Sequence, residues 1–267
     1  MSAGPTIFEE GNVRVERRGF LLTIGIDRPA KRNGFTPAMF EGLASALRRA
    51  EDDDDVRVSV LHAIGDHFSA GLQLDLFEQR LRDGLPLAPA GGVDPFQLRP
   101  PFRTKPCVAA MQGICYTVAI ELMLAADIVV AAADCRFAQI EPRRGIMANH
   151  GATIRMVERA GWGGAMRWLL TGDEFDSATA LRLGFVQEVV EPGRQFARAI
   201  EIAERIAQSA PLAVAATLEN ARLFAERGPR AAVAELGPVQ ARLMRSEDAA
   251  EGMRSFRERR DGAFRGR

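Results

Sequence analysis

Two glutamates in apolar surroundings are the residues of this sequence that best suit chemistry. Glu121 stands in the helical-looking run Tyr116-Thr-Val-Ala-Ile-Glu-Leu-Met-Leu124, and Glu141 follows twenty residues later in Phe137-Ala-Gln-Ile-Glu-Pro142. Burial raises the pKa of a carboxyl group, so such a group can exchange protons with carbon or water near neutral pH. The pair predicts an acid/base site, although a structural salt bridge would also explain either glutamate.

A turn of small residues precedes the first glutamate. The β-branched run that begins at Val58 leads into His67-Phe-Ser-Ala-Gly71. Small residues let the backbone approach a ligand and leave an N–H group free to donate. The turn could therefore hold a developing negative charge, but an ordinary strand-to-helix connection would have the same composition.

Other common site types lack their motifs. The sequence has no GxGxxG after a strand and no GxxxxGK[ST], and the segment around Ser69 lacks the first Gly of GxSxG. His62, His67 and His150 do not fall at ligand spacing, so we expect no metal site. The three cysteines show no CxxC spacing, which indicates buried, reduced thiols and a cytoplasmic location.

The elements that must position these residues alternate between strand and helix. The pattern predicts a hairpin formed by residues 13–17 and 20–26. It also predicts an amphipathic helix over residues 37–50, which begins at Thr36-Pro37. Apolar runs predict strands at residues 56–61, 107–111 and 128–132. Residues 82–106 are rich in Pro and Gly, and we expect a mobile surface excursion there. The pattern favours one α/β unit.

The last third of the chain is rich in Ala and Arg with helical spacing. Helices are expected over residues 197–209, 211–227 and 230–243, which gives a core of residues 1–195 and a helical region of residues 196–267. Its apolar positions, which include Phe196, Ile200, Ile206 and Leu212, exceed what a lone surface extension needs. We expect them to pack against the core and a neighbouring subunit.

Composition excludes several classes of partner. The chain of 267 residues is 47% hydrophobic, and its 35 basic residues balance 35 acidic ones, so no field for nucleic acid or an anionic membrane is expected. The longest apolar run, residues 120–133, contains Glu121 and Asp127 and is too short to span a bilayer. The N-terminal residues lack the pattern of a signal peptide.

An ordered set of motifs resembles the crotonase superfamily, which includes the enoyl-CoA hydratases and isomerases. The resemblance covers about residues 10–265 and is carried by Asp27-Arg-Pro-x-x-x-Asn33, Phe68-Ser-Ala-Gly71, Gln112-Gly113, Glu121-Leu122, Ala126-Asp127, Glu141, Gly151-Ala152 and Leu170-Thr-Gly172. It implies a spiral of ββα turns followed by helices that build a trimer or a dimer of trimers. The implied substrate is an acyl-CoA thioester, with no cofactor beyond the coenzyme A of the substrate.

The resemblance also assigns roles to particular residues. By position, the backbone N–H groups of Ala70 and Val118 form an oxyanion hole that holds the thioester carbonyl as it becomes an enolate. Glu121 and Glu141 match the two glutamates that hold water and move the α-proton. The substrate-binding residues are expected to be Ala70, Gly71, Leu72, Gln73 and Val118. Lys31 and Arg32, with Arg259 or Arg260, are candidates for the CoA phosphates.

Departures from the family pattern leave the reaction open. Thr117-Val118-Ala119 stands where the family has glycines, and Leu72-Gln73 replaces the usual residues after Ser-Ala-Gly. Asn149 and His150 occupy positions that are often small; His150 could touch the substrate or be structural. The first hypothesis is hydration of a trans-2-enoyl-CoA. Double-bond isomerisation and a catalytically weak acyl-CoA-binding subunit are the alternatives.

Overall fold

A seven-stranded sheet forms the centre of the molecule. The computed structural model describes residues 7–10, 12–89 and 91–267. Along the sheet the strands are β1 (Ile7–Glu10), β2 (Val13–Arg18), β3 (Leu21–Ile26), β4 (Val58–Ala63), β5 (Cys107–Met111), β7 (Ile128–Ala132) and β10 (Glu188–Val190). The first three pair antiparallel, and the pairs from β3 to β10 are parallel. The expected hairpin and the α/β class are confirmed.

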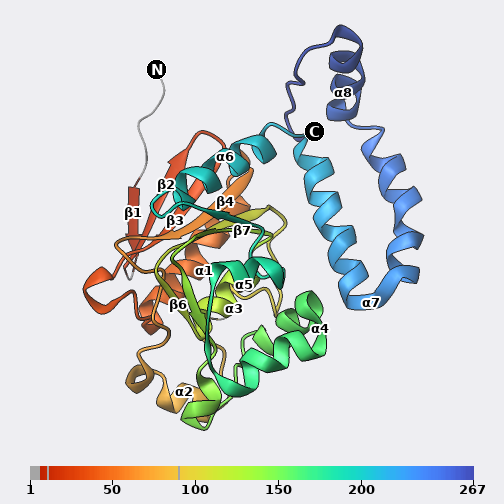
Figure 1. Ribbon diagram of the computed structural model, residues 1–267. Helices are drawn as coiled ribbons and strands as arrows, with labels where there is room; N and C mark the ends of the chain where they lie inside the picture. Colours follow the sequence, from red (N-terminus) through yellow and green to blue (C-terminus); the bar gives the residue numbers. More distant parts are fainter. Residues whose placement is uncertain (1–6, 11, 90) are drawn as a thin grey trace.

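A second, three-stranded sheet and five helices of different lengths stand beside the first sheet. The sheet joins β6 (Ile114–Tyr116), β8 (Arg136–Ala138) and β9 (Glu174–Asp176). The helices of this part are α1 (Pro37–Asp52), α2 (Glu78–Arg82), α3 (Val118–Leu124), α4 (Ala152–Thr171) and α5 (Ser177–Arg182) (Figure 1). As expected, Thr36 caps α1: its hydroxyl accepts from the Met39 N–H at 3.3 Å, and Pro37 opens the first turn.

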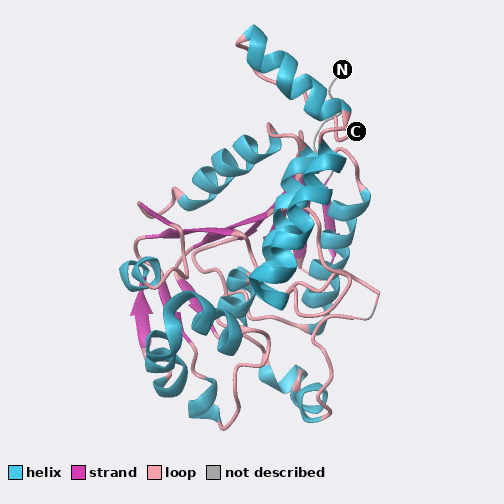
Figure 2. Cartoon of the chain, turned by 90° about the vertical axis from the view of Figure 1, so that its right-hand side faces the viewer, coloured by secondary structure: helices cyan, strands magenta, loops and turns pink. Residues whose placement is uncertain are grey.

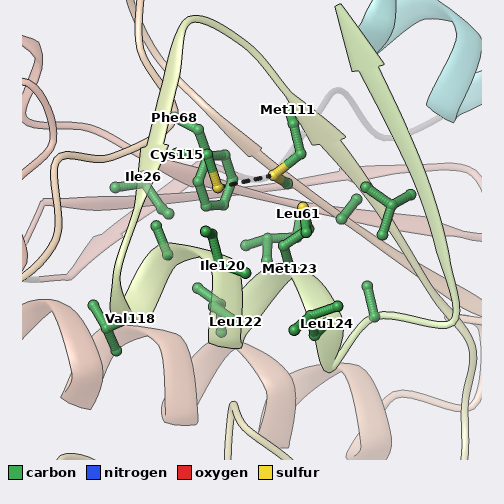
Figure 3. Packing of buried hydrophobic residues seen from close by; sticks show 14 of the residues in the cluster. Ile26, Leu61, Phe68, Met111, Cys115, Val118, Ile120, Leu122, Met123 and Leu124 are labelled. Atoms are coloured by element: carbon green, nitrogen blue, oxygen red, sulfur yellow. Dashed lines mark hydrogen bonds between the residues drawn. The ribbon is translucent and has the colours of Figure 1, made fainter. Parts of the chain in front are cut away.

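Helix α3 lies within the main core. All seven of its residues are buried, although one of them is Glu121. Figure 3 shows its apolar side chains among residues of β3, β4, β5 and β6, with labels on Ile26, Leu61, Phe68, Met111, Cys115, Val118, Ile120, Leu122, Met123 and Leu124. Burial of this kind stabilises a short helix that is too small to form alone. It also fixes the position of any polar group that α3 carries.

The C-terminal region contains three helices. Helix α6 (Gln195–Ala207) packs on the parallel sheet through Ala199, Ile202 and Ala203. Helix α7 (Pro211–Leu243) bends at Gly228, where φ is 78° and ψ is 177°, so it forms the two expected arms. Helix α8 (Glu247–Glu258) follows, and both views show helices that project beyond the sheets at this end (Figures 1 and 2). No helix within the described ranges is long and apolar enough to cross a membrane.

The segment of residues 82–106 corrects one expectation, because part of it belongs to the core. Leu87 and Phe96 are buried, and so is Arg103, which forms an ion pair with Asp127 at 2.5 Å. The carboxylate of Asp94 accepts hydrogen bonds from three backbone N–H groups that follow it, those of Phe96, Leu98 and Arg99. These side-chain bonds order the segment without a helix or strand. Its lack of periodicity therefore did not mean a place on the surface.

Candidate active site

A cavity of about 740 Å³ brings most of the predicted site residues together. Its lining includes both glutamates, Ala70, Leu72, Val118 and His150. Four segments supply them: the turn after β4, the N-terminus of α3, the short helix η3 (Glu141–Arg144) and the loop before α4. The cavity thus lies where the two sheets and α3 meet.

Glu121 is held by the backbone of the loop before α4. One of its carboxylate oxygens accepts from the His150 N–H at 2.7 Å and from the Ala152 N–H at 3.1 Å. The residue is 2% exposed, and burial raises its pKa to about 7, although the two hydrogen bonds oppose the rise. Glu121 can therefore change protonation near neutral pH while its orientation stays fixed.

Glu141 is the less restrained member of the pair. It begins η3, and its Oε2 atom is buried without a hydrogen-bond partner among the described residues. Burial, with a smaller contribution from the negative charge of Glu121, raises its pKa to about 7. A buried carboxyl oxygen without a partner is costly, so a molecule in the cavity would supply the missing hydrogen bond.

The backbone donors of the turn differ from the prediction. The Ala70 N–H donates to the Arg32 carbonyl at 3.0 Å, and the Gly71 N–H donates to the Ser69 hydroxyl at 3.1 Å. Among the described residues, the N–H groups of Leu72 and Val118 have no hydrogen-bond acceptor. The assignment of Ala70 as a donor to the substrate therefore disagrees with its hydrogen bonding, and Leu72 offers the free N–H of this turn.

The motif residue Asn33 fixes the turn. It is fully buried, and its amide nitrogen donates to the carbonyls of Ile64 at 2.9 Å and His67 at 2.8 Å. Its backbone carbonyl accepts from the Ser69 hydroxyl at 2.7 Å. These bonds tie the segment after the first hairpin to the turn after β4. The Asp-Arg-Pro-x-x-x-Asn motif therefore acts as a scaffold for the donor of Leu72.

Thr117 forms the adjoining wall of the cavity in an unusual conformation. Its φ of 55° and ψ of −123° are expected for glycine rather than for a β-branched residue. Its hydroxyl oxygen occupies the space beside Gly71, where an added Cβ would approach it to 2.2 Å. The side chain thus takes the room that a side chain at position 71 would need.

The other predicted residues lie around the cavity or away from it. Gln73 does not line it and donates to Asp75 at 3.2 Å. Lys31 and Arg32 are exposed beside the turn, where the Arg32 carbonyl accepts from Ala70. Arg260 pairs with acidic residues of α8. This helix lies at the opposite end of the molecule from α2 (Figure 1). Within one chain, the tail therefore does not supply a cation to this cavity.

Five further apolar residues of the lining were not expected from the sequence. Leu74 and Leu81 contribute from the segment around α2, and Ile140, Ile146 and Met147 contribute from either side of η3. Ile146 and Met147 are 45% and 63% exposed, which is unusual for large apolar side chains. No periodicity marks these short segments, so their sequence gave no signal. The described residues contain no cluster of three or more His, Cys, Asp or Glu suited to a metal ion.

Fold and site together define an α/β protein in which two glutamates, and two residues whose backbone N–H groups have no acceptor among the described residues, line one cavity. Comparison with solved structures gives the fold. A probable enoyl-CoA hydratase/isomerase from Mycobacterium abscessus superposes with a TM-score of 0.93, at 46% identity over 96% of this chain and 99% of that one. An enoyl-CoA hydratase from Mycobacterium tuberculosis superposes with a TM-score of 0.88, at 36% identity over 97% of this chain and 100% of that one. The crotonase-like fold is therefore confirmed.

Sequence comparison agrees with the structures. The model of the enoyl-CoA hydratase/isomerase family matches residues 16–267, and the chain belongs to that family. It is 31% identical to enoyl-CoA hydratase EchA19 of Mycobacterium tuberculosis, over 95% of this chain and 96% of the relative. It is also 31% identical to carnitinyl-CoA dehydratase of Salmonella typhimurium, over 96% and 99%. Membership of the family supports a hydratase-type enzyme.

Proposed function

We propose that this protein is an enoyl-CoA hydratase, which adds water across the double bond of a trans-2-enoyl-CoA. One observation carries the proposal: Glu121 and Glu141 line the same cavity, and burial raises the pKa of each to about 7. Two interacting carboxyls of this kind hold one proton between them near neutral pH. Hydration needs that state, because one carboxylate must take a proton and one carboxylic acid must give one.

The free N–H groups of Leu72 and Val118 support the electrostatic part of the reaction. In the proposed mechanism they donate to the thioester oxygen as it gains charge in the enolate. Each such donor is typically worth about 3 kcal/mol in the transition state. Ala70 and Gly71 contribute as the backbone that positions Leu72. Lys31 and Arg32 are exposed beside this turn, and we propose that they contact the CoA phosphates.

The two glutamates would divide the proton transfers. Glu121 accepts a proton from water as the water oxygen bonds to the β-carbon, and the π electrons move to the thioester oxygen. Glu141 then gives its proton to the α-carbon as the enolate collapses. Transfer of the proton gained by Glu121 back to Glu141 restores the starting state. The unpartnered oxygen of Glu141 suits the group that must reach carbon.

Isomerisation of a double bond is the second candidate, and one asymmetry favours it. Glu121 is held by two backbone N–H groups, whereas the Oε2 atom of Glu141 has no partner among the described residues. A single mobile carboxyl could move a proton between two carbons without water. A catalytically weak acyl-CoA-binding subunit is the remaining alternative.

Substrate assays separate these candidates. Purified protein is incubated with trans-2-enoyl-CoA and, separately, with 3-enoyl-CoA of the same chain length, and the products are separated by chromatography against standards and identified by mass. Hydratase activity adds the mass of water to the first substrate. Conversion of the second substrate without a change of mass would instead indicate an isomerase. Binding of both without turnover would contradict an enzymatic role for the site.

A further inference from the structure

A second cavity adjoins the first at His150, which belongs to the lining of both. It measures about 380 Å³, and within the described part of the chain His150 alone lines both cavities. The second cavity has an apolar lining that includes Leu85, Leu87 and Phe96, with Asp94 and Arg99 among its polar residues. Leu87 and Phe96 are buried within the protein. The space is thus suited to a hydrocarbon chain.

The His150 side chain is held by packing, and its ring makes no hydrogen bond to the described residues. Its imidazole ring is 5% exposed and packs against the Phe96 ring, with the centroids 4.7 Å apart. Burial lowers its pKa to about 4, so the ring is neutral at physiological pH and compatible with an apolar neighbour. Two links join it to the site: the His150 N–H donates to one carboxylate oxygen of Glu121 at 2.7 Å, and the ring Nδ1 lies 3.9 Å from the other oxygen, which is too far for a hydrogen bond. The ring can therefore move while Glu121 keeps that bond.

We propose that the second cavity continues the acyl site, and that His150 sets the length of acyl chain that enters it. This inference rests on the proposed function, since it assumes an acyl-CoA in the first cavity. Short acyl groups end before the imidazole. Longer, unbranched alkyl chains push the ring aside and place their distal carbons between Leu87 and Phe96. His150 is thus a specificity-determining residue.

Binding of saturated acyl-CoAs tests the proposal without turnover. Dissociation constants for butyryl-CoA and dodecanoyl-CoA are measured by calorimetry on the wild-type protein and on His150→Ala, and the result is expressed as their ratio. Removal of the ring should tighten dodecanoyl-CoA relative to butyryl-CoA by about tenfold or more, because additional methylene groups become buried. His150→Phe, which keeps the wall, should retain the wild-type ratio. An unchanged ratio in His150→Ala would overturn the proposal.

Two further variants separate a local wall from general loosening. His62 is a half-buried histidine whose ring also packs against an aromatic ring, that of Phe196 with the centroids 4.3 Å apart, but it lines neither cavity. His62→Ala should leave the ratio unchanged; an equal change there would refute a specific role for His150. Ala88→Trp fills the second cavity and should cancel the gain of His150→Ala. If these ratios hold but no variant hydrates enoyl-CoA, the proposed function fails while this inference stands.

Discussion

The backbone N–H of Ala70 donates to the carbonyl of Arg32 at 3.0 Å. Because of this bond, the N–H of Ala70 holds the turn in place and is not available to a ligand. The N–H of Leu72, two residues later, has no acceptor among the described residues. The bond between Ala70 and Arg32 also connects the segment that follows β3 to the turn after β4, as the side chain of Asn33 does. The choice of donor in this turn is therefore made by a contact that is distant in sequence.

Proline substitutions distinguish the two backbone donors. Leu72→Pro removes the free N–H, so kcat for the enoyl-CoA should fall by about 10²- to 10³-fold. Ala70→Pro removes the bond to Arg32 but keeps the donors of Leu72 and Val118, so its loss should be smaller. Steady-state kinetics with circular dichroism as a folding control measure both. A larger loss in a folded Ala70→Pro variant would restore Ala70 as the oxyanion donor.

Amide substitutions test the catalytic pair. Glu121→Gln and Glu141→Gln keep the shape of each side chain but remove a proton-transfer group. Each should lower kcat by about 10²-fold or more with little change in KM, and the double variant should lose less than the product of the two. An isomerase would tolerate one of the changes. Wild-type hydration rates in both single variants would remove these residues from the mechanism.

The pH dependence of stability should report the burial of Glu141. Its pKa is raised from 4.5 to about 7, so the folded protein binds more protons than the unfolded chain between these values. Stability from this group is therefore present below about pH 4.5 and is lost as the pH rises towards 7. Glu141→Gln removes the penalty, so its free energy of unfolding should exceed that of the wild type by about 1–3 kcal/mol above pH 7.

Urea unfolding at several pH values measures that difference. It should shrink towards zero near pH 4.5, where the carboxyl is protonated in both states. A difference that stays constant over this range would mean that Glu141 is not the titrating group.

Charge reversal tests the contacts to coenzyme A. Lys31→Glu combined with Arg32→Glu should raise KM for CoA thioesters and affect small thioesters without phosphates much less. Arg48→Glu is a matched control, because Arg48 is an exposed cation on α1 and does not line the main cavity. Equal effects on the two substrate types would exclude Lys31 and Arg32 as phosphate ligands.

The apolar face of α7 predicts self-association. Phe224, Val233 and Leu236 are 56%, 63% and 54% exposed, and Trp162 on α4 is 73% exposed. We expect these surfaces to be covered in a trimer or a dimer of trimers. Sedimentation at micromolar concentration should give the larger species, and Phe224→Glu with Leu236→Glu should shift it towards the monomer. A wild-type monomer would contradict the prediction.

Local signals in the sequence were sufficient for most of the fold. The cap of α1, the hairpin and the apolar strands depend on neighbouring residues, and these elements formed where they were expected. Both glutamates were found because a carboxyl in an apolar run is costly. Leu72 was expected to bind substrate, but the donor role was assigned to Ala70, because the hydrogen bonding of this turn depends on the φ of 102° at Gly71 and on bonds made by distant residues. The burial of Phe96 likewise depends on the Asp94 carboxylate rather than on periodicity.

The contact between Gly71 and Thr117 means that these two positions cannot change independently. An alanine at position 71 would meet the Thr117 hydroxyl at 2.2 Å and would also have to adopt a positive φ. A glycine at position 117 would relieve the collision and the strain at that residue's φ of 55°. The combined change should therefore cost less than the two separate costs added together. The side chain of Thr117 is permitted by the glycine at position 71, so a side chain can be added at position 71 only after Thr117 has changed.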